Sequence, residues 1–153
     1  MNTDRLKQIA EWLEEGAIHV DPSGSKYAFM MHFWKENVGV ERVQEVANEN
    51  NLNWVPGDCG AAMCIGGAAE QFFGDKQEIE SLIENDEYDD EEYAASLLGL
   101  DNLDAQKLFY PWNHFVVGET PLTPQCAAKV IHHLIETGKV DWSIIDGIST
   151  RYE

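Results

Sequence analysis

The chain has 153 residues, 44% of them hydrophobic, and carries 28 Asp and Glu against 10 Lys and Arg, for a formal net charge of −18. Its six Phe, five Trp and five Tyr residues exclude intrinsic disorder, which combines high net charge with low hydrophobicity. The negative charge disfavours direct binding to nucleic acid or to an anionic membrane. The length is that of one ordinary domain, so we expect residues 1–153 to form a single domain.

The N-terminal segment predicts a short helix. Its apolar residues Leu6, Ile9, Ala10 and Leu13 recur at helical spacing. Thr3 and Asp4 suit the start of the helix and Gly16 suits its end. This charged amphipathic opening lacks the apolar core of a signal peptide, and no stretch of the chain approaches the ~20 apolar residues of a membrane span. With an odd number of cysteines, three, we expect free thiols in a reducing compartment, the cytoplasm.

The next two segments differ in how clearly they specify structure. Residues 27–34 are rich in aromatic residues and Met but have neither a strand period nor a helix period, so helix and strand both remain open. Residues 40–50 place Val40, Val43, Val46 and Ala47 on one helical face. We therefore predict a helix there, followed by a loop.

Small residues dominate the segment from Cys59 to Phe73, which has no charge between Cys59 and Glu70. Small side chains allow other backbones to approach closely, so we predict a buried central helix with Gly74 as its C-cap. Two glycines inside a helix cost about 1 kcal/mol each relative to alanine. Close packing or a ligand must therefore compensate.

Short helices are predicted along the second half of the chain. The first contains Ile79, Leu82 and Ile83, and the second runs from Tyr93 to Leu98 and is ended by Gly99. The third contains Ala105, Leu108 and Phe109, with a start at Asp101 to Asp104 and a stop at Pro111. The fourth lies between Thr123-Pro124 and Gly138 and has the apolar residues Ala127, Val130, Ile131 and Leu134. The predicted fold class is mainly α: a compact bundle of short helices around the small-residue helix. Residues 17–20 and 115–117 are candidates for a minor β-hairpin or ladder.

The most charged segment of the chain is residues 78–92, which contains no Lys, Arg or His. Its nine carboxylates belong to Glu78, Glu80, Glu84, Asp86, Glu87, Asp89, Asp90, Glu91 and Glu92. Most charge runs are solvated faces or mobile loops that keep a protein soluble. The alternative is that these carboxylates form a surface that imitates nucleic acid. Duplex phosphates present a charge every ~1.7 Å along the axis, and a similar array of carboxylates could occupy a partner's basic groove.

Cys59 and His114 form a candidate catalytic pair. Cys59 precedes the predicted central helix, whose amides favour a thiolate, and His114 is a candidate base. The phrases Asp58-Cys59-Gly60 and His114 to Val117 resemble the cysteine peptidases that cleave double-glycine leaders. That family has Gln before the nucleophile where this chain has Asn53, and an Asp-Pro after the His that this chain lacks. The simpler interpretation is that Cys59 and Cys64 are small packed residues.

A structural zinc site is another possibility, which needs three or four ligands at one point. The available soft ligands are Cys59, Cys64, Cys126, His114, His132 and His133. The Cys-x4-Cys spacing lacks the compact turn of zinc motifs, and adjacent histidines on a helix point about 100° apart. We therefore expect no metal and no other cofactor.

The sequence from Cys59 to Gly67 resembles a motif of small phage and bacterial proteins, Cys-Gly-Thr-x-x-Cys-x-Ala-Gly before an alanine-rich helix. Two later phrases, Leu97 to Pro111 and Thr123 to Gly138, fit the same proteins in the same order. Ala61 and Gly66 stand where Thr and Ala are common in that family. The resemblance supplies no activity, but it implies a phage or mobile-element setting and hence a host cytoplasm.

These observations lead to one functional expectation. We expect a non-catalytic protein that binds a basic partner through the nine carboxylates, such as a host defence nuclease or another nucleic-acid-binding protein. The runner-up is a cysteine hydrolase with Cys59 as nucleophile and His114 as base. The third hypothesis is a zinc-stapled structural module.

Overall fold

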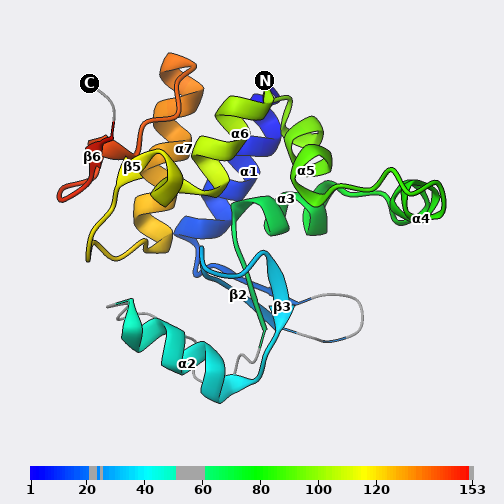
Figure 1. Cartoon of the computed structure of the whole chain (residues 1–153), viewed down its shortest axis with the longest axis horizontal. Coiled ribbons are helices and arrows are strands. Elements are labelled where there is room, and N and C mark those ends of the chain that lie inside the picture. The colour runs from blue at the N-terminus through cyan, green and yellow to red at the C-terminus, as the bar shows by residue number, and fades with distance from the viewer. Residues whose placement is uncertain (21–23, 25, 51–60, 152–153) are drawn as a thin grey trace.

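The computed structural model describes residues 1–20, 24, 26–50 and 61–151 and is mainly helical (Figure 1). The helices of this described part are α1 (Thr3–Glu14), α2 (Val40–Glu49), α3 (Ile65–Phe73), α4 (Lys76–Glu84), α5 (Asp90–Leu98), α6 (Asn102–Phe109) and α7 (Pro124–Thr137), with the 3-10 helices η1 (Pro111–Asn113) and η2 (Trp142–Ile144). None of these helices is both long enough and apolar enough to cross a membrane.

A four-stranded mixed sheet accompanies the helices, with the order β1-β2-β4-β3. Its strands are β1 (Ile18–Val20), β2 (Lys26–Phe29), β3 (Lys35–Asn37) and β4 (Ala61–Met63). Strand β4 pairs parallel to β2, with Ala62 opposite Ala28, and antiparallel to β3. A separate antiparallel pair joins β5 (Phe115–Val116) to β6 (Ser149–Thr150). The segment 27–34, which the sequence left open, thus starts as a strand.

Two sequence predictions are wrong in this region. Residues 17–20 and 115–117 do not pair with each other, because Ile18–Val20 pairs with β2 and Phe115–Val116 pairs with β6. The central helix does not begin near Cys59, since Ala61–Met63 is a strand and the helix starts at Ile65. Alanine and glycine carry no hydrophobic period, so the pattern could not separate strand from helix there. Residues 51–60 lie outside the described residues.

Local start and stop signals agree with the observed helix ends. Asp101 and Thr123 accept hydrogen bonds from backbone N–H groups of α6 and α7 as N-caps. Gly99 and Gly138 adopt left-handed conformations at the ends of α5 and α7. Gly74 ends α3 as predicted, although in an extended conformation. These ends depend on a few consecutive residues, which explains why the sequence sufficed to predict them.

The main hydrophobic core is built by α1, α3, α5, α6 and α7. The four apolar residues predicted to lie on the inner face of α1 are all fully buried. Trp142 of η2 is also fully buried, and its Nε1 donates to the Lys107 carbonyl at 2.9 Å. The C-terminal segment therefore closes the core over the end of α6.

Close packing explains the glycines of α3. A Cβ atom on Gly66 would overlap the Trp34 ring, and one on Gly67 would overlap the Trp34 carbonyl oxygen. The same Trp34 carbonyl oxygen accepts a hydrogen bond from the backbone N–H of Cys64, directly before α3, at 3.1 Å. The small residues thus allow the chain around Trp34 to lie directly on α3.

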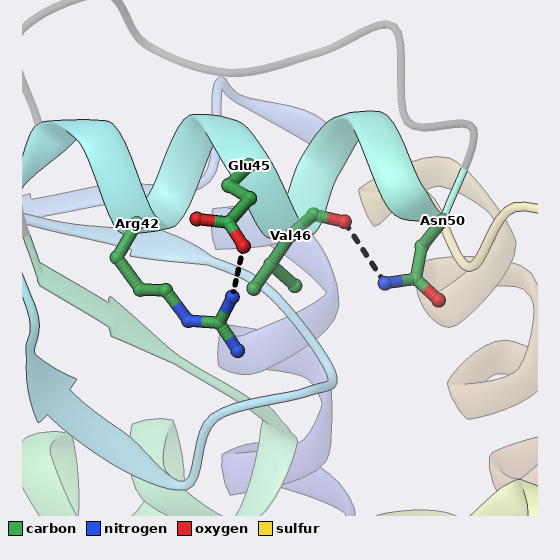
Figure 2. Close-up of polar contacts among 4 residues, drawn as sticks. All are labelled: Arg42, Glu45, Val46 and Asn50. Carbon is green, nitrogen blue, oxygen red and sulfur yellow. Dashed lines mark hydrogen bonds and ion pairs between the residues drawn. The ribbon is translucent and has the colours of Figure 1, made fainter.

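Helix α2 packs apart from the main core. It lies below strands β2 and β3 in Figure 1, whereas the other helices lie above them. Its buried residues Val43, Val46 and Ala47 form a second, smaller cluster with Met30. Figure 2 shows the outer side of this helix, where Arg42 Nη1 lies 2.8 Å from Glu45 Oε1, and its end, where Asn50 Nδ2 donates to the Val46 carbonyl at 2.9 Å.

Candidate functional site

The nine carboxylates of residues 78–92 occupy one helix, one turn and the start of a second helix. We call them the acidic surface: Glu78, Glu80 and Glu84 on α4; Asp86 and Glu87 in the connection; Asp89 as the N-cap of α5; and Asp90, Glu91 and Glu92 in its first turn. All are exposed except Glu91, which is half-buried. The sequence segment is therefore two helical elements joined by a turn.

Helix α4 projects from the rest of the chain, at the right of Figure 1. None of its residues is buried. It is attached mainly at its start, where the Asp75 side chain caps the helix and the Asp75 backbone N–H donates to Tyr93 Oη of α5 at 2.9 Å. The three carboxylates of α4 are thus held away from the main core.

The carboxylates of α5 also have a local structural role. Asp89 accepts a hydrogen bond from Glu92 N at 3.0 Å as the N-cap. Asp90, Glu91 and Glu92 lie where the N-terminal end of the helix dipole stabilises negative charge. This favourable position offsets part of the mutual repulsion of the four groups.

Glu70 of α3 ties the acidic surface to the body of the chain. Its Oε2 accepts a hydrogen bond from Trp34 Nε1 at 3.0 Å, and its Oε1 accepts one from the Tyr88 hydroxyl. Burial raises the pKa of the Glu70 carboxyl above its ordinary value, the Trp34 hydrogen bond lowers it, and the nearby Asp90 charge raises it further. Sequence reasoning missed Glu70, although it is the first charge after Cys59 in that small-residue segment.

A small cleft lies between the start of α5 and helix α6, with a volume of about 160 Å³. It is lined by Asp89, Glu91, Glu92, Asn102, Ala105 and Gln106. At the end of α6, the pKa of the Tyr110 hydroxyl is raised mainly by burial and then by the negative charge of Glu91. Three carboxylates and two amides around a narrow cleft are suited to the cationic end of a Lys or Arg side chain.

The candidate catalytic pair is only partly described. Cys59 lies outside the described residues. His114 is half-buried and follows η1, directly before β5. Cys64, the second cysteine of the motif, is buried, and burial raises the pKa of its thiol to about 11. Cys64 is therefore protonated at neutral pH and is a packing residue rather than a nucleophile.

The described ranges contain no cluster of ligands that would support the zinc hypothesis. Within residues 1–20, 24, 26–50 and 61–151, no three His, Cys, Asp or Glu side chains lie close enough together to hold a metal ion. His132 contacts Glu14 instead, with 2.6 Å between Nε2 and Oε1, and so links α7 to α1. Cys126 lies near the Pro121 carbonyl, with 3.8 Å between sulfur and oxygen.

A larger cleft that the sequence did not indicate lies near the end of α2. Its volume is about 530 Å³, and its lining includes His32, Asn50, Trp112 and Arg151. The His32 ring stacks on Trp112 with 5.6 Å between centroids. Burial lowers the pKa of His32, and a hydrogen bond with Asn50 partly opposes this. The stack connects the α2 side of the molecule to the segment after α6.

Comparisons with protein-family models, with curated proteins and with solved structures find no match for this chain. Its function must therefore be argued from its own residues.

Proposed function

We propose that this chain is a non-catalytic protein that binds a basic partner through the acidic surface. The observation that carries the proposal is the exposure of eight of its nine carboxylates on and beside a helix that projects from the main core. Opposite charge on a partner would relieve the repulsion among these groups and would accelerate association. The small acidic cleft beside α6 is suited to one cationic side chain of that partner.

The proposed partner is a host nucleic-acid-binding protein, such as a defence nuclease, whose basic groove the acidic surface would occupy in place of phosphates. The resemblance of the segment from Cys59 to Gly67 to small phage and bacterial proteins supports a phage or mobile-element setting. In this proposal the chain acts in the host cytoplasm as one compact domain.

The test compares two variants that each lose four negative charges. One neutralises the acidic surface by Glu80→Gln, Glu84→Gln, Glu87→Gln and Glu92→Gln. The matched control neutralises exposed carboxylates elsewhere, by Glu11→Gln, Glu15→Gln, Glu41→Gln and Glu136→Gln. Asp89 and Asp90 are kept, because the first caps α5 and the second lies near Glu70.

Each chain is used to capture proteins from host lysate at low and high salt, and the captured protein is then purified and bound to a labelled DNA duplex. The wild type and the control variant should displace the duplex, whereas the surface variant should do so about tenfold less well or worse at low salt. Equal displacement by both variants would contradict the proposal, since only the total charge would then matter. Capture of no basic protein by the wild type would also contradict it.

A further inference from the structure

Helix α4 carries an apolar stripe as well as carboxylates. Ile79, Leu82 and Ile83 recur at the i, i+3, i+4 spacing that places side chains on one helical face. Ile79 and Leu82 are half-buried, and Ile83 has 57% of its surface exposed, the largest exposed fraction among the large hydrophobic residues described. None of the three is fully buried, and Ile83 is the residue of the stripe that stays exposed.

The charges around the stripe restrict what can cover it. Glu78 and Glu80 lie on the two sides of the stripe, and Glu84 lies on the opposite side of the helix. Lys76, at the start of α4 on the same face as Ile79 and Ile83, is the single positive charge of this helix, so the surface around the stripe is negative overall. A second copy of the chain would bring three carboxylates and only one Lys of each α4 against the same set, which is unfavourable in net charge. An anionic membrane surface would be repelled in the same way. Charge complementarity therefore favours a positively charged protein surface as the partner that covers the stripe.

We propose that α4 docks its stripe of Ile79, Leu82 and Ile83 against a patch of apolar side chains on the partner protein. Lys or Arg residues of the partner surround this patch. This inference rests on the proposed function and narrows it, because the partner then offers an amphipathic basic surface and not a uniformly charged groove. Apolar contact persists at high salt, whereas contacts between exposed charges are screened. Binding should thus have a salt-resistant part that depends on Ile83.

The test uses two synthetic peptides of equal length and equal positive charge. One alternates Lys with Leu at helical spacing, and the other has Ser in place of every Leu. The wild-type chain should bind the Lys-Leu peptide about tenfold more tightly than the Lys-Ser peptide in 0.5 M NaCl, where charge contacts are largely screened. Ile83→Gln should remove most of this difference, and Ile83→Leu should retain it. Val40→Gln, at an exposed residue that begins α2 and lies outside α4, should leave it unchanged.

The outcomes separate this inference from the proposed function. Equal binding of both peptides by the wild type overturns the apolar contact but leaves an interaction with basic partners. An equal loss with Val40→Gln also overturns it, because the effect would not be specific to α4. A wild-type dimer in sedimentation that Ile83→Gln dissociates overturns it too, since the stripe would then bind a second copy. Circular dichroism of each variant verifies that the helices are retained.

Discussion

Trp34 donates a hydrogen bond from Nε1 to Glu70 Oε2 at 3.0 Å, across 36 residues of sequence. The same tryptophan lies on the two glycines of α3 with its ring and its carbonyl oxygen. Glu70 in turn accepts a hydrogen bond from Tyr88, within the acidic segment. One aromatic residue thus connects the sheet, the small-residue helix and, through Glu70, the base of the acidic surface.

Replacing Gly67 by alanine is expected to destabilise the fold. The new Cβ would overlap the Trp34 carbonyl oxygen, and a backbone atom moves less easily than the end of a side chain. We expect a loss of about 2 kcal/mol or more in the free energy of unfolding, measured by urea denaturation, despite the better helix propensity of alanine. The control Gly16→Ala meets no atom within 4 Å and should cost about 1 kcal/mol through its left-handed backbone alone. A Gly67→Ala protein as stable as the wild type would contradict this packing.

Two substitutions of Glu70 are expected to distinguish the contribution of its hydrogen bond to stability from that of its charge. Glu70→Ala leaves Trp34 Nε1 without its acceptor and should cost about 1–3 kcal/mol. Glu70→Gln keeps an acceptor oxygen and should cost less at pH 7. The pKa of the folded carboxyl is raised, so the wild type should gain stability relative to Glu70→Gln as pH falls from neutral toward the ordinary value of 4.5. Urea unfolding of both proteins at several pH values measures this difference, and parallel curves would contradict it.

The cysteines are expected to differ in reactivity toward iodoacetamide. A Cys64 pKa of about 11, against an ordinary value of 9.0, lowers its thiolate fraction at pH 8 about 100-fold. Peptide mapping by mass spectrometry should therefore find Cys64 unmodified in the folded chain and modified in urea. Fast labelling of Cys64 in the folded chain would contradict its burial. The same map reads Cys59: rapid alkylation well below pH 8 would favour the hydrolase hypothesis, and an inert Cys59 would remove it.

His32 is expected to make the fold sensitive to mild acid. Its folded pKa is lowered by burial, so the stability that depends on the neutral ring is present above the ordinary value of 6.5 and is lost as pH falls below it. His32→Phe keeps an aromatic ring to stack on Trp112 but cannot be protonated. Between pH 7.5 and pH 5.5 the wild type should lose more stability in urea unfolding than His32→Phe. An equal loss in both proteins would show that the other titrating groups account for the whole effect.

Local sequence was enough to determine most helices and their ends. The apolar stripes of α1 and α7, the caps Asp101 and Thr123, and the stop at Gly99 depend on residues within one or two turns of each other. Such short-range interactions can be read without knowing what the helix packs against. The charge of the acidic surface was likewise evident from composition alone.

Tertiary structure decided the strand at Ala61–Met63, the pairing of the sheets and the partners of Glu70. Strand β4 is a strand because β2 and β3 supply hydrogen bonds on both of its sides, and helix α2 separates it from both of them in sequence. The stack of His32 on Trp112 and the contact of Trp34 with α3 join residues that are far apart along the chain. Small and aromatic residues carry no period that names their partners, so only the folded chain determines where they meet.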